Sequence, residues 1–106
     1  MKQPELFLRE KDKLALLEIA DEYLPDISIW AYGSRVTGKA HESSDLDIVL
    51  RSIDLKPIPI GAFADFVDAL KESNIPILID VFDWARLPES FHEGILEAYV
   101  ILDHMN

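Results

Sequence analysis

Two pairs of residues in this chain have types and spacing that could do chemistry. Gly33 and Ser34 follow a short β-prone segment, and Asp45 and Asp47 begin a second such segment after ten intervening residues. Side chains alternate between the faces of a strand, so we expect both aspartates on one face and Leu46 facing a core. Neighbouring carboxylates repel unless a cation lies between them, and oxygen ligands at this spacing suit Mg²⁺. The aspartate pair therefore predicts a magnesium site.

Gly33 and Ser34 would provide a place for phosphate beside that metal. Glycine lets the backbone approach an anion closely, and the N–H groups that open a helical turn point towards it. Arg35 comes next, and a guanidinium binds phosphate through two parallel hydrogen bonds. The alternative for Arg35 is a surface side chain paired with Glu42 or Asp45. We expect Gly33, Ser34 and Arg35 to contact a nucleoside triphosphate.

Three other interpretations compete for this stretch. A P-loop pattern fits from Gly33 to Lys39, but Ala40 replaces the hydroxyl that would ligate Mg²⁺, and too few residues follow for its long helix. An EF-hand beginning at Asp45 would place Leu50 where glycine is needed. The third is a turn followed by a strand with two exposed acids. Against it, Gly-Ser and Asp-x-Asp at one fixed spacing arise by chance about 10⁻⁵ times per start position.

The rest of the chain divides into elements that would hold these residues. Apolar periodicity predicts helices over 8–24 and 60–73, a last helix from Pro88 with an apolar face reaching Leu102, and strands over 27–32, 45–51 and 75–82. The run 75–82 is almost continuously apolar, which is typical of a central strand covered on both faces. A lone acid there is costly unless it is paired or near a metal. We therefore assign Asp80 to the site and Asp83 to capping the following turn.

Composition limits the class of protein. With 106 residues and 49% hydrophobic content, residues 1–106 are expected to form a single domain with a real core. Cysteine is absent, so there is no disulfide framework or thiolate metal site. Neither a signal peptide nor a membrane-spanning run is recognisable, so we expect a cytoplasmic protein. The net charge of −10 argues against direct nucleic-acid binding and suits a basic protein partner.

Three segments are similar to the signature of the polymerase β-like nucleotidyltransferase superfamily: Trp-Ala-Tyr-Gly-Ser-Arg at 30–35, Ser-Asp-Leu-Asp-Ile at 44–48 and Ile-Asp-Val at 79–81. At this length the whole chain resembles the minimal, MNT-type nucleotidyltransferases, which are antitoxins to HEPN-domain ribonucleases. The resemblance implies an α+β fold of two layers, with a mixed sheet backed by helices. It also implies a third carboxylate, Asp80, on a later strand that faces the aspartate pair.

The resemblance further implies a Mg²⁺-dependent enzyme. Asp45, Asp47 and Asp80 would be the catalytic residues and the ligands of one or two Mg²⁺, and Asp80 would also orient or deprotonate the acceptor hydroxyl. ATP would be the donor, and AMP would pass to a tyrosine of a HEPN toxin. We expect a hetero-oligomer with that toxin; a homodimer of the chain alone stays open. Neither nucleic acid nor membrane is expected as a partner.

The second hypothesis is a non-catalytic antitoxin that neutralises a helical partner by covering it. The presence of all three acids favours the enzyme, because a protein that only binds does not need them.

A third hypothesis, nucleotidylation of a small molecule such as an aminoglycoside, is disfavoured. Larger members of the superfamily add a helical domain that helps to bind the base and the acceptor, and we expect no such second domain in these 106 residues. Here a partner is expected to complete the site, or else nucleotide binds weakly. Arg86 and His92 loosely resemble a HEPN ribonuclease motif, but Pro88 between them argues against it.

Overall fold

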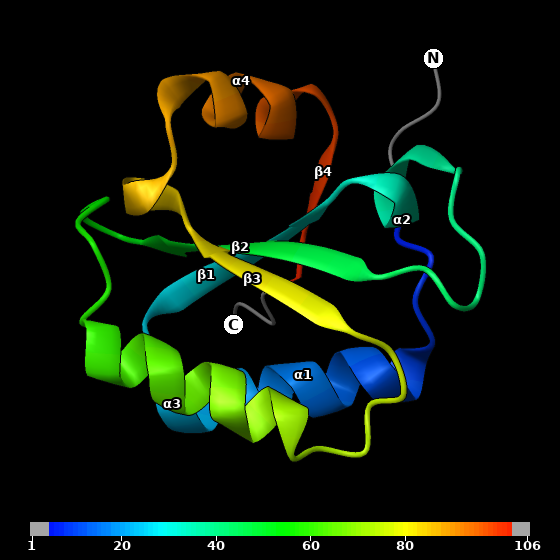
Figure 1. Ribbon diagram of the computed structural model, residues 1–106, viewed down its shortest axis with the longest axis horizontal. Coiled ribbons are helices and arrows are strands. Elements are labelled where there is room, and N and C mark those ends of the chain that lie inside the picture. Colours follow the sequence, from blue (N-terminus) through cyan, green and yellow to red (C-terminus); the bar gives the residue numbers. More distant parts are fainter. Residues whose placement is uncertain (1–4, 103–106) are drawn as a thin grey trace.

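The computed structural model describes residues 5–102 (Figure 1). Its elements, in chain order, are α1 (Glu10–Tyr23), β1 (Ile27–Tyr32), α2 (Ser34–Thr37), β2 (Leu46–Ser52), α3 (Ile60–Lys71), β3 (Ile79–Asp83), the 3-10 helix η1 (Trp84–Arg86), α4 (Glu89–Glu97) and β4 (Tyr99–Ile101). Within residues 5–102, no helix combines the length and apolar character needed to cross a membrane.

The four strands form one mixed sheet in the order β3-β2-β1-β4. Strand β1 is antiparallel to both β2 and β4, whereas β2 and β3 are parallel. Helices α1 and α3 lie side by side under one face of the sheet, and α4 lies on the opposite side (Figure 1). This mixed sheet backed by helices is the α+β fold class that the sequence predicts.

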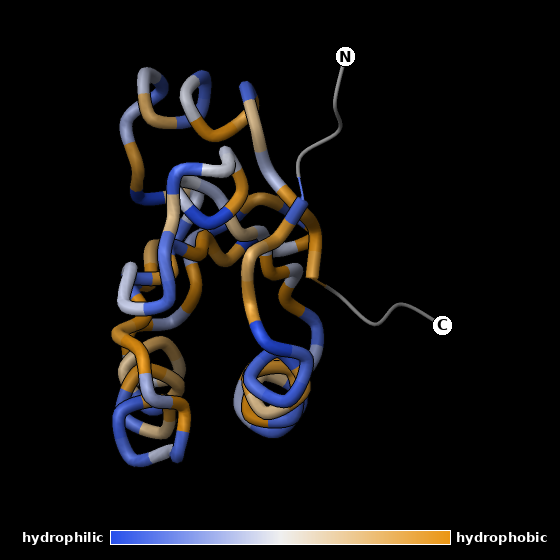
Figure 2. Tube along the Cα trace, turned by 90° about the vertical axis from the view of Figure 1, so that its right-hand side faces the viewer, coloured by the Kyte–Doolittle hydropathy of each residue, from blue (hydrophilic) through white to orange (hydrophobic). Residues whose placement is uncertain are grey.

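The main core lies between the sheet and the α1–α3 pair. Ile29 on β1 and Ile48 on β2 meet Leu16 and Phe66 of the helices, and all four are at most 1% exposed. Removal of this apolar surface from water is the main driving force that holds the two layers together. In Figure 2 the strands run largely in hydrophobic colours between the helix pair and α4.

A second, smaller core covers part of the opposite face. It contains Trp30, Val49, Trp84 and Ile95, and Tyr99 packs on it with its ring stacked on Trp30 at a centroid distance of 4.5 Å. Val49 shares its face with Asp47, but η1 and α4 bury it completely. The face that carries the aspartates is therefore apolar at one end and open at the other.

The prediction of a central strand over 75–82 is wrong in position and extent. Strand β3 begins only at Ile79 and lies at the edge of the sheet, paired with β2 alone. Ile77, Ile79 and Val81 are partly buried, while Leu78 and Phe82, which alternate with them, are exposed. Apolar residues on the exposed side thus make an ordinary alternating edge strand look continuously apolar.

The prediction that the last helix continues to Leu102 is also wrong. Helix α4 ends at Glu97, and Tyr99–Ile101 form β4, which pairs with the free edge of β1. Leu102 is 1% exposed because it joins the main core below the sheet. Over so few residues, the same apolar positions fit either the apolar face of a helix or a strand. Only the long-range pairing with β1 decides between the two.

Candidate active site

One row of side chains crosses the sheet where β1 ends and β2 begins. The strand register pairs Tyr32 with Tyr99 on one side and with Asp47 on the other, and it pairs Asp47 with Asp80. Residues directly opposite in adjacent strands project from the same face. The register therefore places Asp47 and Asp80, which the sequence assigned to one site, next to each other.

Gly33 connects this row to the turn that follows β1. Its φ of 80° and ψ of −154° lie in a region that is open almost only to glycine. A Cβ atom at this position would stand 2.5 Å from Oδ2 of Asp47, which is closer than such contacts occur. The missing side chain lets the carboxylate lie directly against the Gly33–Ser34 turn. Helix α2 starts at Ser34 and is a single turn, as the sequence predicts.

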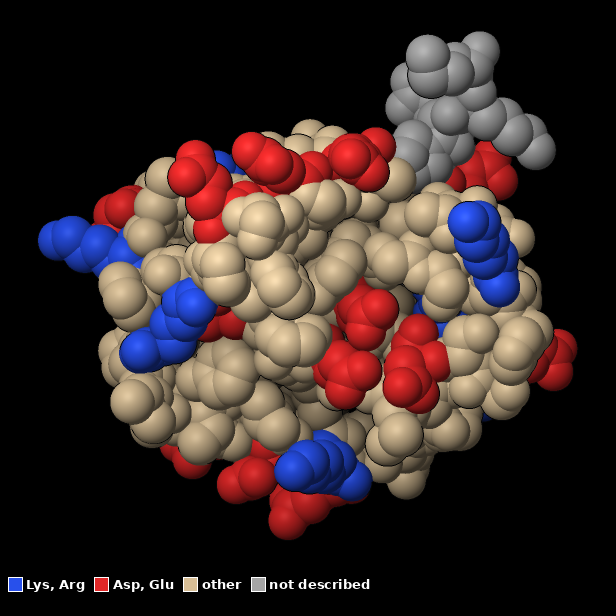
Figure 3. Space-filling view, turned by 45° about the horizontal axis from the view of Figure 1, so that its top comes forward, with Lys and Arg blue, Asp and Glu red and all other residues tan. Residues whose placement is uncertain are grey.

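Electrostatic repulsion is concentrated at Asp47. Burial raises the pKa of its carboxyl group, and the neighbouring Asp80, followed by Asp45, raises the pKa further. Burial, with the charges of Asp47 and Asp80, also raises the pKa of Tyr32 to about 12, so the phenol keeps its proton at neutral pH. Figure 3 shows acidic side chains gathered near the middle of this side of the molecule. A cation bound here would relieve the repulsion.

The oxygen donors of this row fit Mg²⁺ in an open site. Within residues 5–102, no three His, Asp or Glu side chains converge into a ready-made metal cage. Mg²⁺ characteristically takes one or two protein carboxylates and fills its octahedron with water and substrate phosphate oxygens. Asp47 and Asp80, with Asp45 nearby, match that requirement.

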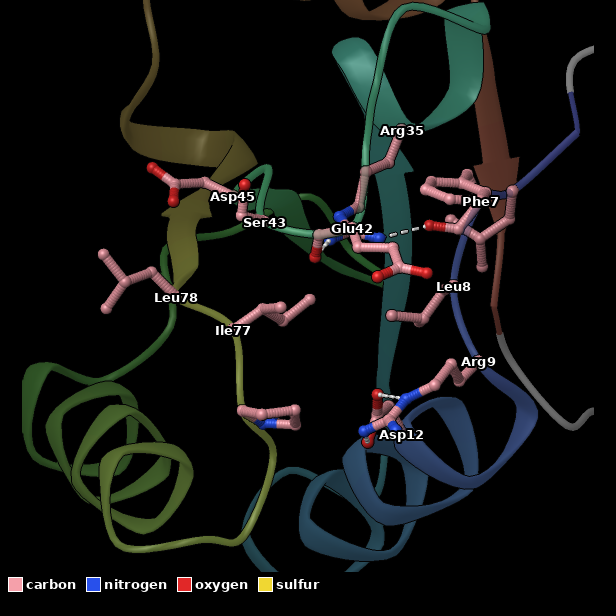
Figure 4. Close-up of a pocket in the computed structure, with 12 residues that line it drawn as sticks. Phe7, Leu8, Arg9, Asp12, Arg35, Glu42, Ser43, Asp45, Ile77 and Leu78 are labelled. Carbon is pink, nitrogen blue, oxygen red and sulfur yellow. Dashed lines mark hydrogen bonds and ion pairs between the residues drawn. The ribbon is translucent and has the colours of Figure 1, made fainter.

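Asp45 occupies the boundary between this row and a neighbouring cavity. It is exposed and lies one residue before β2. The cavity has a volume of about 720 Å³ and opens between the segment before α1 and the segment before β3. Figure 4 shows Asp45 at its rim, with Ile77 and Leu78 on one side and Phe7 and Leu8 on the other. Asp45 is thus exposed, as Asp80 is, whereas Asp47 is half-buried.

Arg35 differs from both sequence-based interpretations. It is 4% exposed, and its guanidinium donates to the backbone carbonyl oxygens of Phe7, Glu42 and Ser44. Figure 4 shows Arg35 beside Phe7 and Glu42. Arg35 is therefore neither turned towards the place expected for a triphosphate nor a surface side chain paired with an acidic one. Those carbonyl oxygens satisfy the donors that phosphate recognition would need.

The capping role predicted for Asp83 is confirmed. Its carboxylate accepts hydrogen bonds from the N–H groups of Ala85, at the start of η1, and of Ile58, and it forms an ion pair with Arg86. The side chain is buried, and it holds the loop before α3 against the end of β3. Asp80, by contrast, is exposed and faces Asp47.

The two acids of β3 should consequently respond in opposite ways to the same substitution. Asp83→Asn weakens the charge-assisted hydrogen bonds at a buried position and should cost about 1–3 kcal/mol of unfolding free energy. Asp80→Asn removes an exposed carboxylate that repels Asp47, so it should not lower the urea midpoint, while it lowers nucleotidyl transfer about 100-fold. Urea unfolding and a transfer assay on both variants check this. A stable Asp83→Asn protein without activity, beside an active Asp80→Asn protein, would reverse the assignment.

Tyr32 is the residue of the row that sequence reasoning missed. Strand alternation places it on the face of Trp30, and this signal is present in the sequence. Its position beside Asp47 depends on the pairing of β1 with β2, which no local pattern reveals.

Comparisons with known proteins identify the family and the fold of this chain. The family model described as "Nucleotidyltransferase domain" matches residues 14–93. A solved toxin–antitoxin structure with AMP-PNP superposes with a TM-score of 0.70 at 17% identity, covering 92% of this chain and 76% of the other. A tri-AMPylated Shewanella oneidensis HEPN toxin in complex with MNT antitoxin gives a TM-score of 0.68 at 13% identity, covering 92% and 74%. At these identities the structures show the shared fold.

The chain belongs to the nucleotidyltransferase domain family, to which the matched family model assigns it. Within that family it is 37% identical over 94 residues to the probable protein adenylyltransferase MntA of Haemophilus influenzae, covering 88% of this chain and 81% of that relative. The predicted resemblance to minimal nucleotidyltransferases is therefore confirmed.

Proposed function

We propose that this protein transfers AMP from ATP to a tyrosine hydroxyl of a HEPN-domain ribonuclease and so acts as its antitoxin. The observation that carries the proposal is the contact between the Gly33–Ser34 turn and Asp47, with Asp80 adjacent, on a nucleotidyltransferase fold. The name of the Haemophilus influenzae relative, a probable protein adenylyltransferase, supports a protein as acceptor. The AMP-PNP of one similar solved structure and the HEPN toxin of the other support the donor and the partner.

Each residue has a defined task in this proposal. Asp45, Asp47 and Asp80 would hold Mg²⁺, which would supply neutralisation of the charge on the triphosphate. The Gly33 backbone and the Ser34 hydroxyl orient the β- and γ-phosphates. Asp80, exposed on the edge strand, orients the acceptor hydroxyl and receives its proton. The acceptor oxygen bonds to the α-phosphorus as the bond from that phosphorus to the β-phosphate oxygen breaks, and pyrophosphate leaves.

The open shape of the site agrees with a macromolecular acceptor. Asp80 and Asp45 are both exposed, so an incoming protein segment can reach them. The net charge of −10 favours approach by a basic partner surface. We further propose that residues 1–106 act as a single domain in the cytoplasm, where a ribonuclease toxin would need to be neutralised.

Intact-protein mass spectrometry tests the proposed function. A HEPN-domain protein from the genome that encodes this chain is incubated with the chain, ATP and Mg²⁺. We expect a mass gain of one or more AMP units on that protein, and none with the Asp45→Asn/Asp47→Asn variant. Peptide mapping should place the AMP on tyrosine. A tight complex without any mass gain, formed equally well by both versions, would instead establish a non-catalytic antitoxin.

A further inference from the structure

A buried arginine lies directly behind the loop that carries Asp45. Arg35 makes four hydrogen bonds to carbonyl oxygens: Nε to Ser44 at 3.0 Å, Nη2 to Ser44 at 2.7 Å and to Glu42 at 2.9 Å, and Nη1 to Phe7 at 2.6 Å. Burying a charged group is unfavourable unless its donors are satisfied, and here backbone oxygens satisfy them. The guanidinium thus holds two chain segments that are distant in sequence.

The first of these segments is the loop between α2 and β2. Two of the four bonds reach the Ser44 carbonyl, and this oxygen belongs to the peptide unit that joins Ser44 to Asp45. A peptide unit is planar, so fixing its oxygen fixes the direction in which the chain enters Asp45. The forked guanidinium restrains both the position and the tilt of that plane.

The second segment precedes α1. Phe7 and Arg35 bond reciprocally, because the Phe7 N–H also donates to the Arg35 carbonyl at 2.7 Å. The Phe7 ring lies 5.5 Å from the guanidinium carbon, within cation–π range. The segment before α1 therefore restrains Arg35 on one side, and Arg35 in turn restrains the loop that carries Asp45 on its other side.

We propose that Arg35 is a positioning residue that fixes the backbone at Asp45 and so sets the metal-binding geometry of its carboxylate. This inference rests on the proposed function for the role of Asp45, and it gives Arg35 no contact with nucleotide. A group that orients a metal ligand from behind typically changes metal affinity or activity about 10–100-fold when it is removed.

Arg35→Lys tests the proposal because it keeps the positive charge but removes the forked arrangement of N–H donors. A single ammonium cannot hold the Ser44, Glu42 and Phe7 carbonyls together. We expect the affinity for a non-hydrolysable ATP analogue to fall about tenfold in Mg²⁺ and to stay at the wild-type value in EDTA. An equal fall under both conditions would mean that Arg35 contacts phosphate itself and would overturn the proposal. So would wild-type affinity under both conditions.

Amide hydrogen exchange gives a readout that needs no nucleotide. Arg35→Lys should speed exchange in residues 41–46 while β1 and the middle of β2 keep their protection. Arg86→Lys is a matched control, because Arg86 also donates to a backbone carbonyl, that of Ile58, but lies away from Asp45. It should leave exchange in 41–46 unchanged. Wild-type exchange of this loop in the Arg35→Lys protein would overturn the positioning role.

Phe7→Ala decides the question if the lysine variant unfolds. Phe7 is 46% exposed, so removal of its ring spares the core while it loosens the support for Arg35. Faster exchange confined to residues 41–46 supports the proposal, and unchanged exchange overturns it. If the wild-type chain binds no nucleotide with or without Mg²⁺, the proposed function fails, but the exchange measurement still decides whether Arg35 positions the loop.

Discussion

Replacing Asp47 with asparagine is expected to lower nucleotidyl transfer at least about 1,000-fold and to leave the fold intact. Asp47 lies between Asp80 and the Gly33–Ser34 turn, so the loss of its charge affects both metal and phosphate binding. Asparagine has nearly the same shape, and the side chain is only half-buried, so no cavity is created. The mass-spectrometric assay for AMP transfer measures this loss.

The same substitution should raise stability at neutral pH. Burial and Asp80 raise the pKa of Asp47, so the folded chain binds this proton more tightly than the unfolded chain does. Stability of the wild type therefore falls as pH rises from the ordinary carboxyl pKa, about 4, through the raised value. Asparagine does not titrate, so its advantage in Tm should be present above that range and absent below it.

Thermal unfolding with and without Mg²⁺ completes this test. Mg²⁺ should raise the Tm of the wild type and have little effect on Asp47→Asn, because a ligand stabilises only the form that binds it. Asp68→Asn is the control, since Asp68 is an exposed acid on α3 beneath the opposite face. It should change neither the transfer rate nor the response to Mg²⁺. Wild-type transfer by Asp47→Asn would mean that the chemistry takes place elsewhere.

Gly33→Ala should both destabilise the protein and damage the site. Its φ and ψ angles cost a residue with a side chain about 1–3 kcal/mol, and the new Cβ would also meet Asp47 Oδ2 at 2.5 Å. The carboxylate must move away from the turn, so we expect about 3 kcal/mol of lost unfolding free energy together with lost Mg²⁺-dependent nucleotide affinity. Urea unfolding and nucleotide titration measure the two effects.

Gly38→Ala separates backbone strain from the contact with Asp47. Gly38 has a φ of 82°, but nothing lies within 4 Å of a Cβ placed there. It should cost only about 1–2 kcal/mol and leave nucleotide affinity unchanged. In an Asp47→Ala background, Gly33→Ala should also lose most of its excess cost, because the clashing oxygen atom is gone. Equal effects of the two glycine substitutions on nucleotide affinity would show that the contact with Asp47 is unimportant.

The sequence alone determined the features that depend on neighbours along the chain. Apolar periodicity located α1, α3 and the strands β1 and β2. The Gly-Ser pair marked the turn against Asp47, and Asp83 was correctly assigned as a cap. These features follow from backbone preferences and side-chain alternation over a few residues, which the order of residue types already specifies. The three segments that resemble the family signature are likewise short stretches of consecutive residues.

Only the tertiary structure decided the features that depend on pairing between distant segments. Strand register brought Asp80 and Tyr32 to Asp47, and the free edge of β1 made 99–101 a strand instead of the end of a helix. The edge position of β3 depends on which strand lies in the middle of the sheet. Arg35 turned inward because carbonyls of two remote segments converge on it. Such choices are made by the free energy of the whole packed chain, and local propensity is too weak to determine them.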